Sequence, residues 1–383
     1  MAIAAVSLSI AVMILAIATG KGLQEKISAK VTGFTSDIQI SMLDLNQSLE
    51  VSPILADSLL THELESIDGI KHIQTQITKN ALIKTDKEFE GIIVKGVNTN
   101  YDWSFIKTHI TEGATPKYTH EKKSNDILIS KNIAQKLNLK IDDKALFYFQ
   151  GKNNSQPFVR KFKISGIYQT GIEVFDEHYV FADQKHLRKM NRWTENQCSS
   201  IEIQLRKGYD SQAVLLEIEQ KTPYDTQVVS AKEKYAQIFD WIGLFDLNIA
   251  IVLLIMIVVA CINMISSLLI VILERTKMIG LMKAMGAADV SIKKIFLYHA
   301  YYLLRKGLII GNVIGLTLIG VQYYLSPIQL DPEHYYVKAL PVLLSIENWV
   351  LINLCSVIIC MVILIIPSIL IQRIDTIKAI RYE

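Results

Sequence analysis

The sequence lacks charged residues in four long stretches. These stretches are residues 1–20, 247–273, 307–330 and 348–372. Each is long enough to cross a bilayer as a helix, which takes about 20 predominantly apolar residues. With half of its residues hydrophobic, the chain is too apolar for an ordinary soluble protein, and we predict four transmembrane helices.

Motifs for catalysis and metal binding are also missing. The sequence has no Gly-x-x-x-x-Gly-Lys-Ser/Thr phosphate loop, no His-Glu-x-x-His, no Cys-x-x-Cys and no Gly-x-Ser-x-Gly. The eight histidines have no ligand-like spacing, and Asp176-Glu177-His178 is typical of a solvated acidic cluster. We therefore expect no catalytic residue, no metal site and no cofactor bound by this chain.

Ionisable side chains are almost absent from the apolar stretches, which contain only neutral polar groups such as Asn263 and Asn312. A carrier driven by an ion gradient normally needs charges at membrane depth, so this class is disfavoured. Segment 21–246 carries 29 basic and 30 acidic side chains, so no nucleic-acid partner is expected. Its single cysteine, Cys198, is expected to be buried.

The distribution of Lys and Arg predicts the orientation of the spans. Segment 274–306 has seven Lys or Arg and two acidic residues, whereas the loop after the third span has only Lys338 against three acidic residues. Because basic loops stay in the cytoplasm, segment 274–306 is placed inside and segment 21–246 outside. The predicted order is helix 1–20, outer domain 21–246, helix 247–273, cytoplasmic segment 274–302, helix 303–326, outer loop 327–346, helix 347–372 and cytoplasmic tail 373–383.

The outer segment is predicted to be a mixed α/β domain. Short apolar or alternating runs predict strands at 127–130, 145–149, 162–167, 179–181 and 201–205. Helices are predicted at 132–137 and 211–221. Segments 21–100 and 200–240 flank what we interpret as an inserted subdomain at about 110–195.

The first apolar stretch has two interpretations. Ala16-Ile17-Ala18 resembles a signal-peptidase site, but the stretch is longer than a signal-peptide core and no basic residue precedes it. We expect a retained helix. The nearest positive charge, Lys21, lies on the outer side, so either the true start lies upstream of Met1 or later loops set the orientation.

A short amphipathic segment follows the second span directly. Apolar side chains in it recur at i, i+3, i+4 and i+7, on one face of a helix. They are Met278, Leu281, Met282 and Met285. Gly286 predicts the end of this helix, and Asp289 the cap of the next. The pattern fits a helix lying in lipid headgroups as well as one that binds a partner protein.

Glycines recur in the third span at intervals of four and five residues. They are Gly307, Gly311, Gly315 and Gly320. Small residues at such spacing let two helices pack closely. The partner helix lies either in the same subunit or in a second copy.

Segment 274–287, read as Glu-Arg-Thr-x-x-Ile-Gly-x-x-x-Ala-x-Gly-Ala, resembles the coupling segment of FtsX-like ABC-transporter permeases. Segment 377–383, Ile-Lys-Ala-Ile-Arg-Tyr-Glu, is similar to the closing motif of that family, with Thr376 in place of the usual Pro. Four further segments are most similar to the lipoprotein-releasing (Lol-type) branch. They are 34–40, 127–139, 164–171 and 330–341.

The resemblance implies a transport subunit of the bacterial inner membrane, without an ATPase site of its own. ATP and Mg²⁺ would be bound by a separate ABC ATPase subunit, and a second permease chain, identical or different, would pair with this one. The residues implied to couple to the ATPase are Glu274, Arg275, Lys277, Met278, Ile279, Gly280, Leu281, Met282, Lys283, Met285 and Gly286.

The Lol-type branch further implies a lipoprotein substrate, whose acyl chains enter from the outer leaflet between the first two spans. The outer domain would then pass the lipoprotein to a periplasmic carrier protein. Apolar side chains suited to these acyl chains, or equally to membrane lipid, are Val12, Leu15, Ala16, Ile249, Val252, Leu253 and Met256.

Three other functions stay open at this point. A MacB-like exporter of peptides or drugs often carries its ATPase in the same chain, and this sequence has none. An FtsX-type regulator of cell-wall hydrolases typically has a much smaller outer domain than 21–246. A membrane-anchored enzyme would need catalytic residues that the sequence lacks.

Overall fold

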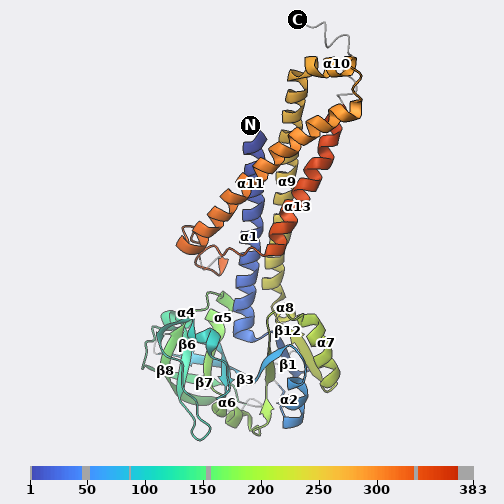
Figure 1. Cartoon of the computed structure of the whole chain (residues 1–383). Helices are drawn as coiled ribbons and strands as arrows, with labels where there is room; N and C mark the ends of the chain where they lie inside the picture. The colour runs from blue at the N-terminus through green and yellow to red at the C-terminus, as the bar shows by residue number, and fades with distance from the viewer. Residues whose placement is uncertain (1, 45–51, 86–87, 152–156, 332–334, 370–383) are drawn as a thin grey trace. The chain divides into compact units, whose positions relative to one another are not determined.

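The computed structural model describes residues 2–44, 52–85, 88–151, 157–331 and 335–369 (Figure 1). By its internal contacts the chain divides into a helical unit (1–26, 240–331 and from 337 onward) and an α/β unit (27–239 and 332–336). Within these residues, four helices are long and apolar enough to span a membrane: α1 (Ala2–Thr35), α9 (Ala236–Glu274), α11 (Asp289–Leu325) and α13 (Ile346–Ser368). The predicted fold class, four membrane helices with a mixed α/β domain between the first two, is confirmed.

Three of these helices extend beyond the apolar runs that predicted them. In the continuation of α1, one face repeats an apolar side chain each turn, and these side chains are buried: Leu23, Ile27, Val31 and Phe34. The predicted domain limits at 21 and 246 therefore fall inside helices, and α11 begins well before 303. A helix can continue past its apolar run where its side chains pack against the rest of the protein. The end of a helix therefore does not mark the membrane boundary.

The glycines of α11 pack against α1 within this chain. A Cβ atom on Gly311 would lie 2.7 Å from the carbonyl oxygen of Ser7, and one on Gly307 would lie 2.8 Å from the Val6 side chain. Gly315 also faces α1, whereas Gly320 has nothing within 4 Å. Close packing inside one subunit thus accounts for three of the four glycines.

Polar side chains join α11 to α13 within the helical unit. The Asn312 amide donates to the Oδ1 atom of Asn353 at 2.6 Å, and the Trp349 indole donates to the Oδ1 atom of Asn312 at 2.6 Å. Such hydrogen bonds hold membrane helices together where the hydrophobic effect does not.

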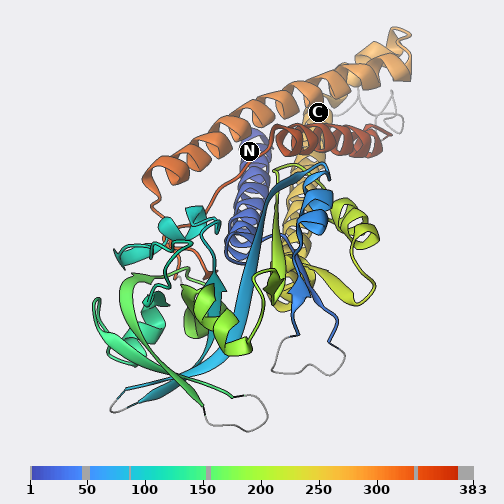
Figure 2. The ribbon, with the colours of Figure 1, turned by 90° about the horizontal axis from the view of Figure 1, so that it is seen from below.

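The α/β unit contains a ten-stranded sheet in the order β12-β1-β11-β3-β4-β9-β6-β8-β5, with β7 paired to β3 and β8. The long strand β3 runs through this sheet (Figure 2). The strands are β1 (Ile38–Met42), β3 (Ile70–Lys84), β4 (Phe89–Val97), β5 (Ile110–Gly113), β6 (Asp126–Ser130), β7 (Lys144–Phe149), β8 (Phe158–Tyr168), β9 (Tyr179–Asp183), β11 (Ser200–Leu205) and β12 (Thr226–Ser230).

In the described part of this unit, a two-stranded sheet and seven short helices accompany the large sheet. The small sheet pairs β2 (Ile54–Leu55) with β10 (Gln197–Cys198). The helices are α2 (Ser58–Glu65), α3 (Ser104–Lys107), α4 (Lys131–Lys136), α5 (Glu173–His178), α6 (Gln184–Asn191), α7 (Ser211–Lys221) and α8 (Ala231–Lys234). All five predicted strands and both predicted helices of the outer domain are confirmed. The elements that were not predicted are β1, β2, β3, β4, β5, β10 and β12 and the short helices α2, α3, α5, α6 and α8.

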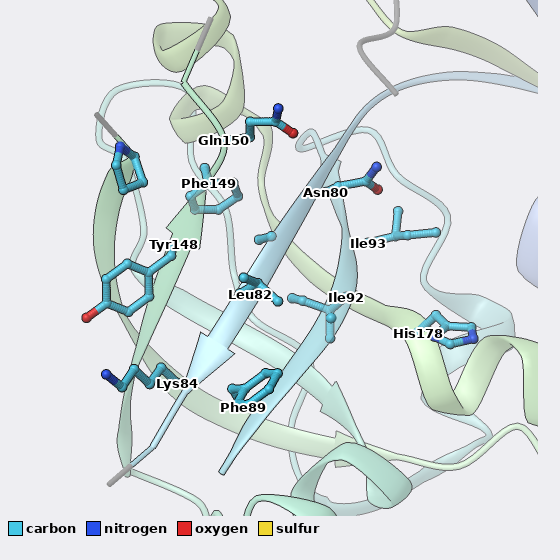
Figure 3. A pocket seen from close by; sticks show the side chains of 13 residues that line it. Asn80, Leu82, Lys84, Phe89, Ile92, Ile93, Tyr148, Phe149, Gln150 and His178 are labelled. Atoms are coloured by element: carbon cyan, nitrogen blue, oxygen red, sulfur yellow. The ribbon is translucent and has the colours of Figure 1, made fainter. Parts of the chain in front are cut away.

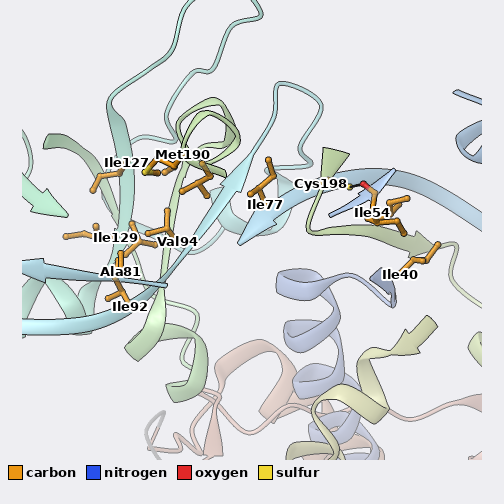
Figure 4. Packing of buried hydrophobic residues seen from close by; sticks show 14 of the residues in the cluster. Ile40, Ile54, Ile77, Ala81, Ile92, Val94, Ile127, Ile129, Met190 and Cys198 are labelled. Carbon is orange, nitrogen blue, oxygen red and sulfur yellow. Dashed lines mark hydrogen bonds between the residues drawn. The ribbon is translucent and has the colours of Figure 1, made fainter. Parts of the chain in front are cut away.

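Apolar side chains from β3, β4, β6 and α6 form the core of this unit (Figure 4). Alternate residues of β3, such as Ile77 and Ala81, point into this core. Cys198 is 2% exposed in the same cluster, which confirms that it is buried.

Candidate functional site

The predicted coupling segment forms helix α10 (Thr276–Ala284), directly after α9. Gly286 ends it with φ +85°, a left-handed conformation that glycine adopts without strain. The amide of Gly286 donates to the carbonyl of Lys283, and that of Ala287 to the carbonyl of Met282, both at 3.0 Å. This pair of bonds is a Schellman motif, and the predicted helix stop at Gly286 is confirmed.

The start of the next helix differs from the prediction. The residue that caps α11 is Ala288, without a side-chain hydrogen bond, so the expected cap at Asp289 is wrong by one position. Asp289 instead lies in the first turn of α11, where its carboxylate meets the Lys283 ammonium at 3.1 Å. A carboxylate there also complements the positive end of the helix dipole.

The faces of α10 divide its residues into two groups. Ile279 and Gly280 are buried, and Met282 packs partly against the core of the helical unit. The remaining apolar side chains are exposed, at 38% for Met278, 56% for Leu281 and 73% for Met285. Exposed charged residues lie next to them: Glu274, Arg275 and Lys277. The surface that α10 presents is therefore apolar with a charged margin, and Met282 is not its centre.

The residues expected to face acyl chains are all half-buried. They are Val12, Leu15 and Ala16 of α1, and Ile249, Val252, Leu253 and Met256 of α9. Ile249, Leu253 and Met256 pack against the helical core. Other α9 side chains are more exposed: Ile251, Leu254, Ile255 and Val258. The apolar run alone does not distinguish these two faces, because every position in it is hydrophobic.

A buried ion pair in the α/β unit was not predicted. Lys95 of β4 and Glu202 of β11 are each 2% exposed, and their Nζ and Oε1 atoms lie 2.8 Å apart. Lys95 also donates to the carbonyl of Phe34 at 3.0 Å, and the Gln74 amide donates to the Oε2 atom of Glu202 at 2.8 Å. A charge pair out of water persists only when such additional hydrogen bonds satisfy it.

Aromatic rings surround the Lys95 ammonium, which lies 5.4 Å from the ring centres of Phe34 and Tyr101. Burial, and secondarily the charge of Glu202, raises the pKa of the Tyr101 hydroxyl well above its usual value. The sequence signal was a lone lysine in the apolar strand 92–97 and a lone acid in 201–205, but nothing in the sequence joined two residues 107 positions apart.

An apolar groove lies on the other end of the same β3–β4 pair, with a volume of about 970 Å³ (Figure 3). Leu82 and Phe89 of this groove are 48% and 75% exposed. Its remaining lining residues are Asn80, Ala81, Lys84, Gly91, Ile92, Ile93, Tyr148, Phe149, Gln150, Pro157 and His178. Exposed apolar surface of this kind commonly marks a contact with an apolar ligand or partner.

Four apolar helices, an exposed amphipathic helix after the second of them and a large α/β domain after the first form the architecture of a multi-spanning membrane protein. Residues 1–221 match the family model of the MacB-like periplasmic core domain, and residues 250–376 match that of the FtsX-like permease C-terminal domain. The chain belongs to the FtsX-like permeases with a MacB-like periplasmic core domain.

Two curated relatives are similar to most of the chain. The chain is 20% identical to the lipoprotein-releasing system transmembrane protein LolE of Haemophilus influenzae, over 88% of this chain and 82% of that protein. It is 18% identical to the lipoprotein-releasing system transmembrane protein LolC of Neisseria meningitidis, over 100% and 93%. The chain is thus similar to LolC and LolE permeases over most of its length, at low identity.

Two solved structures are similar to part of the chain. One is the extracellular domain of the noncanonic ABC-type transporter YknZ from Gram-positive bacteria, with 17% identity and a TM-score of 0.33 over 50% of this chain and 98% of that one. The other is the periplasmic region of MacB from Actinobacillus actinomycetemcomitans, with 9% identity and a TM-score of 0.35 over 52% and 91%.

Proposed function

We propose that this chain is the permease subunit of an ATP-driven transporter that extracts lipoproteins from the outer leaflet of the inner membrane. It acts with a second permease chain, and the extracted lipoprotein passes from the outer domain to a periplasmic carrier protein. The observation that carries the proposal is similarity to a lipoprotein-releasing protein over 88% of this chain. The exposed apolar groove on β3 and β4 is consistent with a domain that handles apolar groups.

Energy enters this transporter through a separate ABC ATPase, which binds ATP and Mg²⁺. The proposed contact is the exposed face of α10, where Met278, Leu281 and Met285 offer apolar surface beside charged residues. An amphipathic helix binds a partner by laying this kind of face into a groove. In the competing arrangement, the same face of α10 would lie in the lipid headgroups instead of against a partner protein.

The cargo is tested by depletion of this protein, followed by separation of inner and outer membranes and quantification of a lipidated marker. Accumulation of the marker in the inner membrane is the expected result. Normal sorting of the marker overturns the lipoprotein assignment and leaves the family assignment intact.

The ATPase contact is tested by Leu281→Glu, which places a charge on the exposed face without disturbing the helical core. We expect a loss of transport of at least about ten-fold, with ATP hydrolysis uncoupled and membrane insertion unchanged. Leu281→Met is the matched control and should transport normally. Met282→Glu should also uncouple the complex, but its partial burial adds a packing defect. Unchanged transport by Leu281→Glu would contradict the contact.

A second candidate is a MacB-like exporter of peptides or drugs, favoured by the match of residues 1–221 to the MacB-like periplasmic core domain. It predicts normal lipoprotein sorting on depletion together with lower tolerance of exported toxic compounds. Growth in the presence of such compounds, measured on the same depleted cells, separates the two candidates.

A further inference from the structure

The Lys30 side chain meets two segments that are distant in the sequence. Its Nζ atom donates to the carbonyl of Thr170 at 2.5 Å and to the carbonyl of Tyr336 at 2.7 Å. Lys30 belongs to α1, Thr170 to the turn between β8 and α5, and Tyr336 to the connection between α11 and α13. One ammonium group thus holds three segments of the α/β unit together.

The Thr170 turn is fixed from its other side by Asp176 of α5. Asp176 is 2% exposed, so the expectation that Asp176-Glu177-His178 is a solvated cluster is wrong at Asp176. The carboxylate of Asp176 accepts hydrogen bonds from the Thr170 amide at 2.9 Å, the Thr170 hydroxyl at 2.8 Å and the Gly171 amide at 2.8 Å. Asp176 therefore accepts the hydrogen bonds that this turn donates, while Lys30 donates a hydrogen bond to the Thr170 carbonyl. The turn has little freedom to move independently of either residue.

Gly171 makes the approach of Lys30 feasible. Its φ of +76° lies in the left-handed region, and a Cβ atom there would lie 3.1 Å from the Lys30 Nζ atom and 3.5 Å from the Tyr336 carbonyl oxygen. Any side chain at 171 would crowd the ammonium and strain the turn. The backbone is thus shaped to admit this contact.

The part of α1 that carries Lys30 is itself anchored. Its Phe34 ring stacks on Phe175 of α5 at 4.3 Å between ring centres, and the Phe34 carbonyl accepts a hydrogen bond from the buried Lys95 at 3.0 Å. Lys30 lies one helical turn before Phe34. It therefore projects from a helix end that is rigid with respect to its own domain.

We propose that Lys30 is a positioning residue that ties the connection between the third and fourth spans to the outer domain. Movement of α11, which follows the coupling helix in the chain, then reaches the Thr170 turn through Tyr336 and Lys30, in parallel with movement along α1. The inference rests on the proposed function, because ATP-driven coupling supplies the movement. In this proposal the outer domain receives movement by a second route besides α1, and Lys30 is the side chain that receives it.

The test compares Lys30→Met with Lys26→Met, an exposed lysine one turn earlier in α1, in the full complex with its ATPase. Backbone hydrogen exchange is measured in peptides covering 168–172 and 335–340, with and without a non-hydrolysable ATP analogue. In the wild type and in Lys26→Met, we expect the analogue to change exchange in both peptides. In Lys30→Met, the change in 168–172 should fall about five-fold or more, while the change in 335–340 remains.

Gly171→Ala provides a second variant, because it crowds the same contact from the opposite side. It should reduce the response of 168–172 as Lys30→Met does, even if one of the two variants folds poorly. A wild-type response of both peptides in both variants overturns the proposal, as does a wild-type complex that responds in neither peptide. This readout needs no cargo, so a complex that releases no lipoprotein but keeps the Lys30-dependent response would refute the proposed function alone.

Discussion

Lys95 and Glu202 occupy positions that water hardly reaches, and each also bonds a neutral partner. A lysine replaced alone leaves a carboxylate buried without its counter-charge. We therefore expect Lys95→Met to lower the unfolding free energy of the outer domain by about 3–5 kcal/mol. Chemical unfolding of the full chain in detergent, followed by the fluorescence of Trp103 and Trp193 in a background with Trp241→Phe and Trp349→Phe, measures this change.

The double variant Lys95→Met with Glu202→Gln serves as the control for that prediction. It removes both charges, so it should recover a large part of the stability that Lys95→Met loses. If the double variant instead loses the sum of the two single changes, the pair is not coupled and the prediction is wrong.

Burial sets the reactivity of Cys198 as well. Desolvation raises the pKa of this thiol to about 12. A thiol reacts through its thiolate, and at pH 8 only about one Cys198 in ten thousand carries that charge. Because the pKa is raised, the thiolate appears only as pH rises toward 12, and alkylation in the native protein should be negligible at pH 8.

Mass spectrometry of the peptide that contains Cys198, after iodoacetamide treatment at pH 8, tests this expectation. Treatment in denaturant, where the thiol regains its ordinary pKa and access, should label it fully. Rapid labelling of the native protein would show that the 54–55 and 197–198 strand pair opens readily around this residue.

At the scale of helices, α1 and α11 can approach closely because α11 offers no side chain at three successive contacts. Gly311→Val should force them apart and lower stability by about 1–3 kcal/mol, since a Cβ there would lie 2.7 Å from a backbone oxygen. Gly320→Val makes the same chemical change in the same helix where nothing lies within 4 Å. Thermal unfolding in detergent should separate the two variants, and equal stabilities would contradict the packing inside one subunit.

Helices and strands differed in how well their sequences predicted them. Uncharged runs and the Met278–Met285 spacing located the membrane helices and α10, because periodicity and length act locally. Strand β3 was not predicted because one face of it is polar, with Gln74, Gln76 and Thr78, although two of these are buried. A polar residue that is satisfied by a distant partner looks, in sequence, like one that faces water.

The candidate sites divide in the same way. The coupling segment was predicted from its spacing and its resemblance to a family. The Lys95–Glu202 pair and the Lys30 contacts join residues that are far apart in the sequence, so no local sequence pattern predicts them. The sequence did not predict which side of α10 is exposed, because Met282 belongs to the same apolar stripe as Met278 and Leu281 but packs inward.

At the scale of the whole molecule, the proposed function requires that α10 and the outer domain lie on opposite sides of the membrane. The seven Lys or Arg of segment 274–306, against Lys338 alone in the loop after the third span, predict that arrangement. In a variant whose four cysteines are replaced, we introduce either Glu121→Cys in the outer domain or Met285→Cys at the end of α10. Both positions are exposed.

A membrane-impermeant maleimide applied to spheroplasts should label the cysteine introduced at position 121 and leave the one at position 285 unlabelled. Permeabilised membranes should label both, which shows that position 285 is accessible once the reagent crosses the bilayer. The reverse pattern would place the outer domain in the cytoplasm, where a periplasmic carrier cannot reach it. Labelling of both positions in intact spheroplasts would place α10 outside the cell membrane. It could then not contact a cytoplasmic ATPase, and coupling through α10 would be impossible.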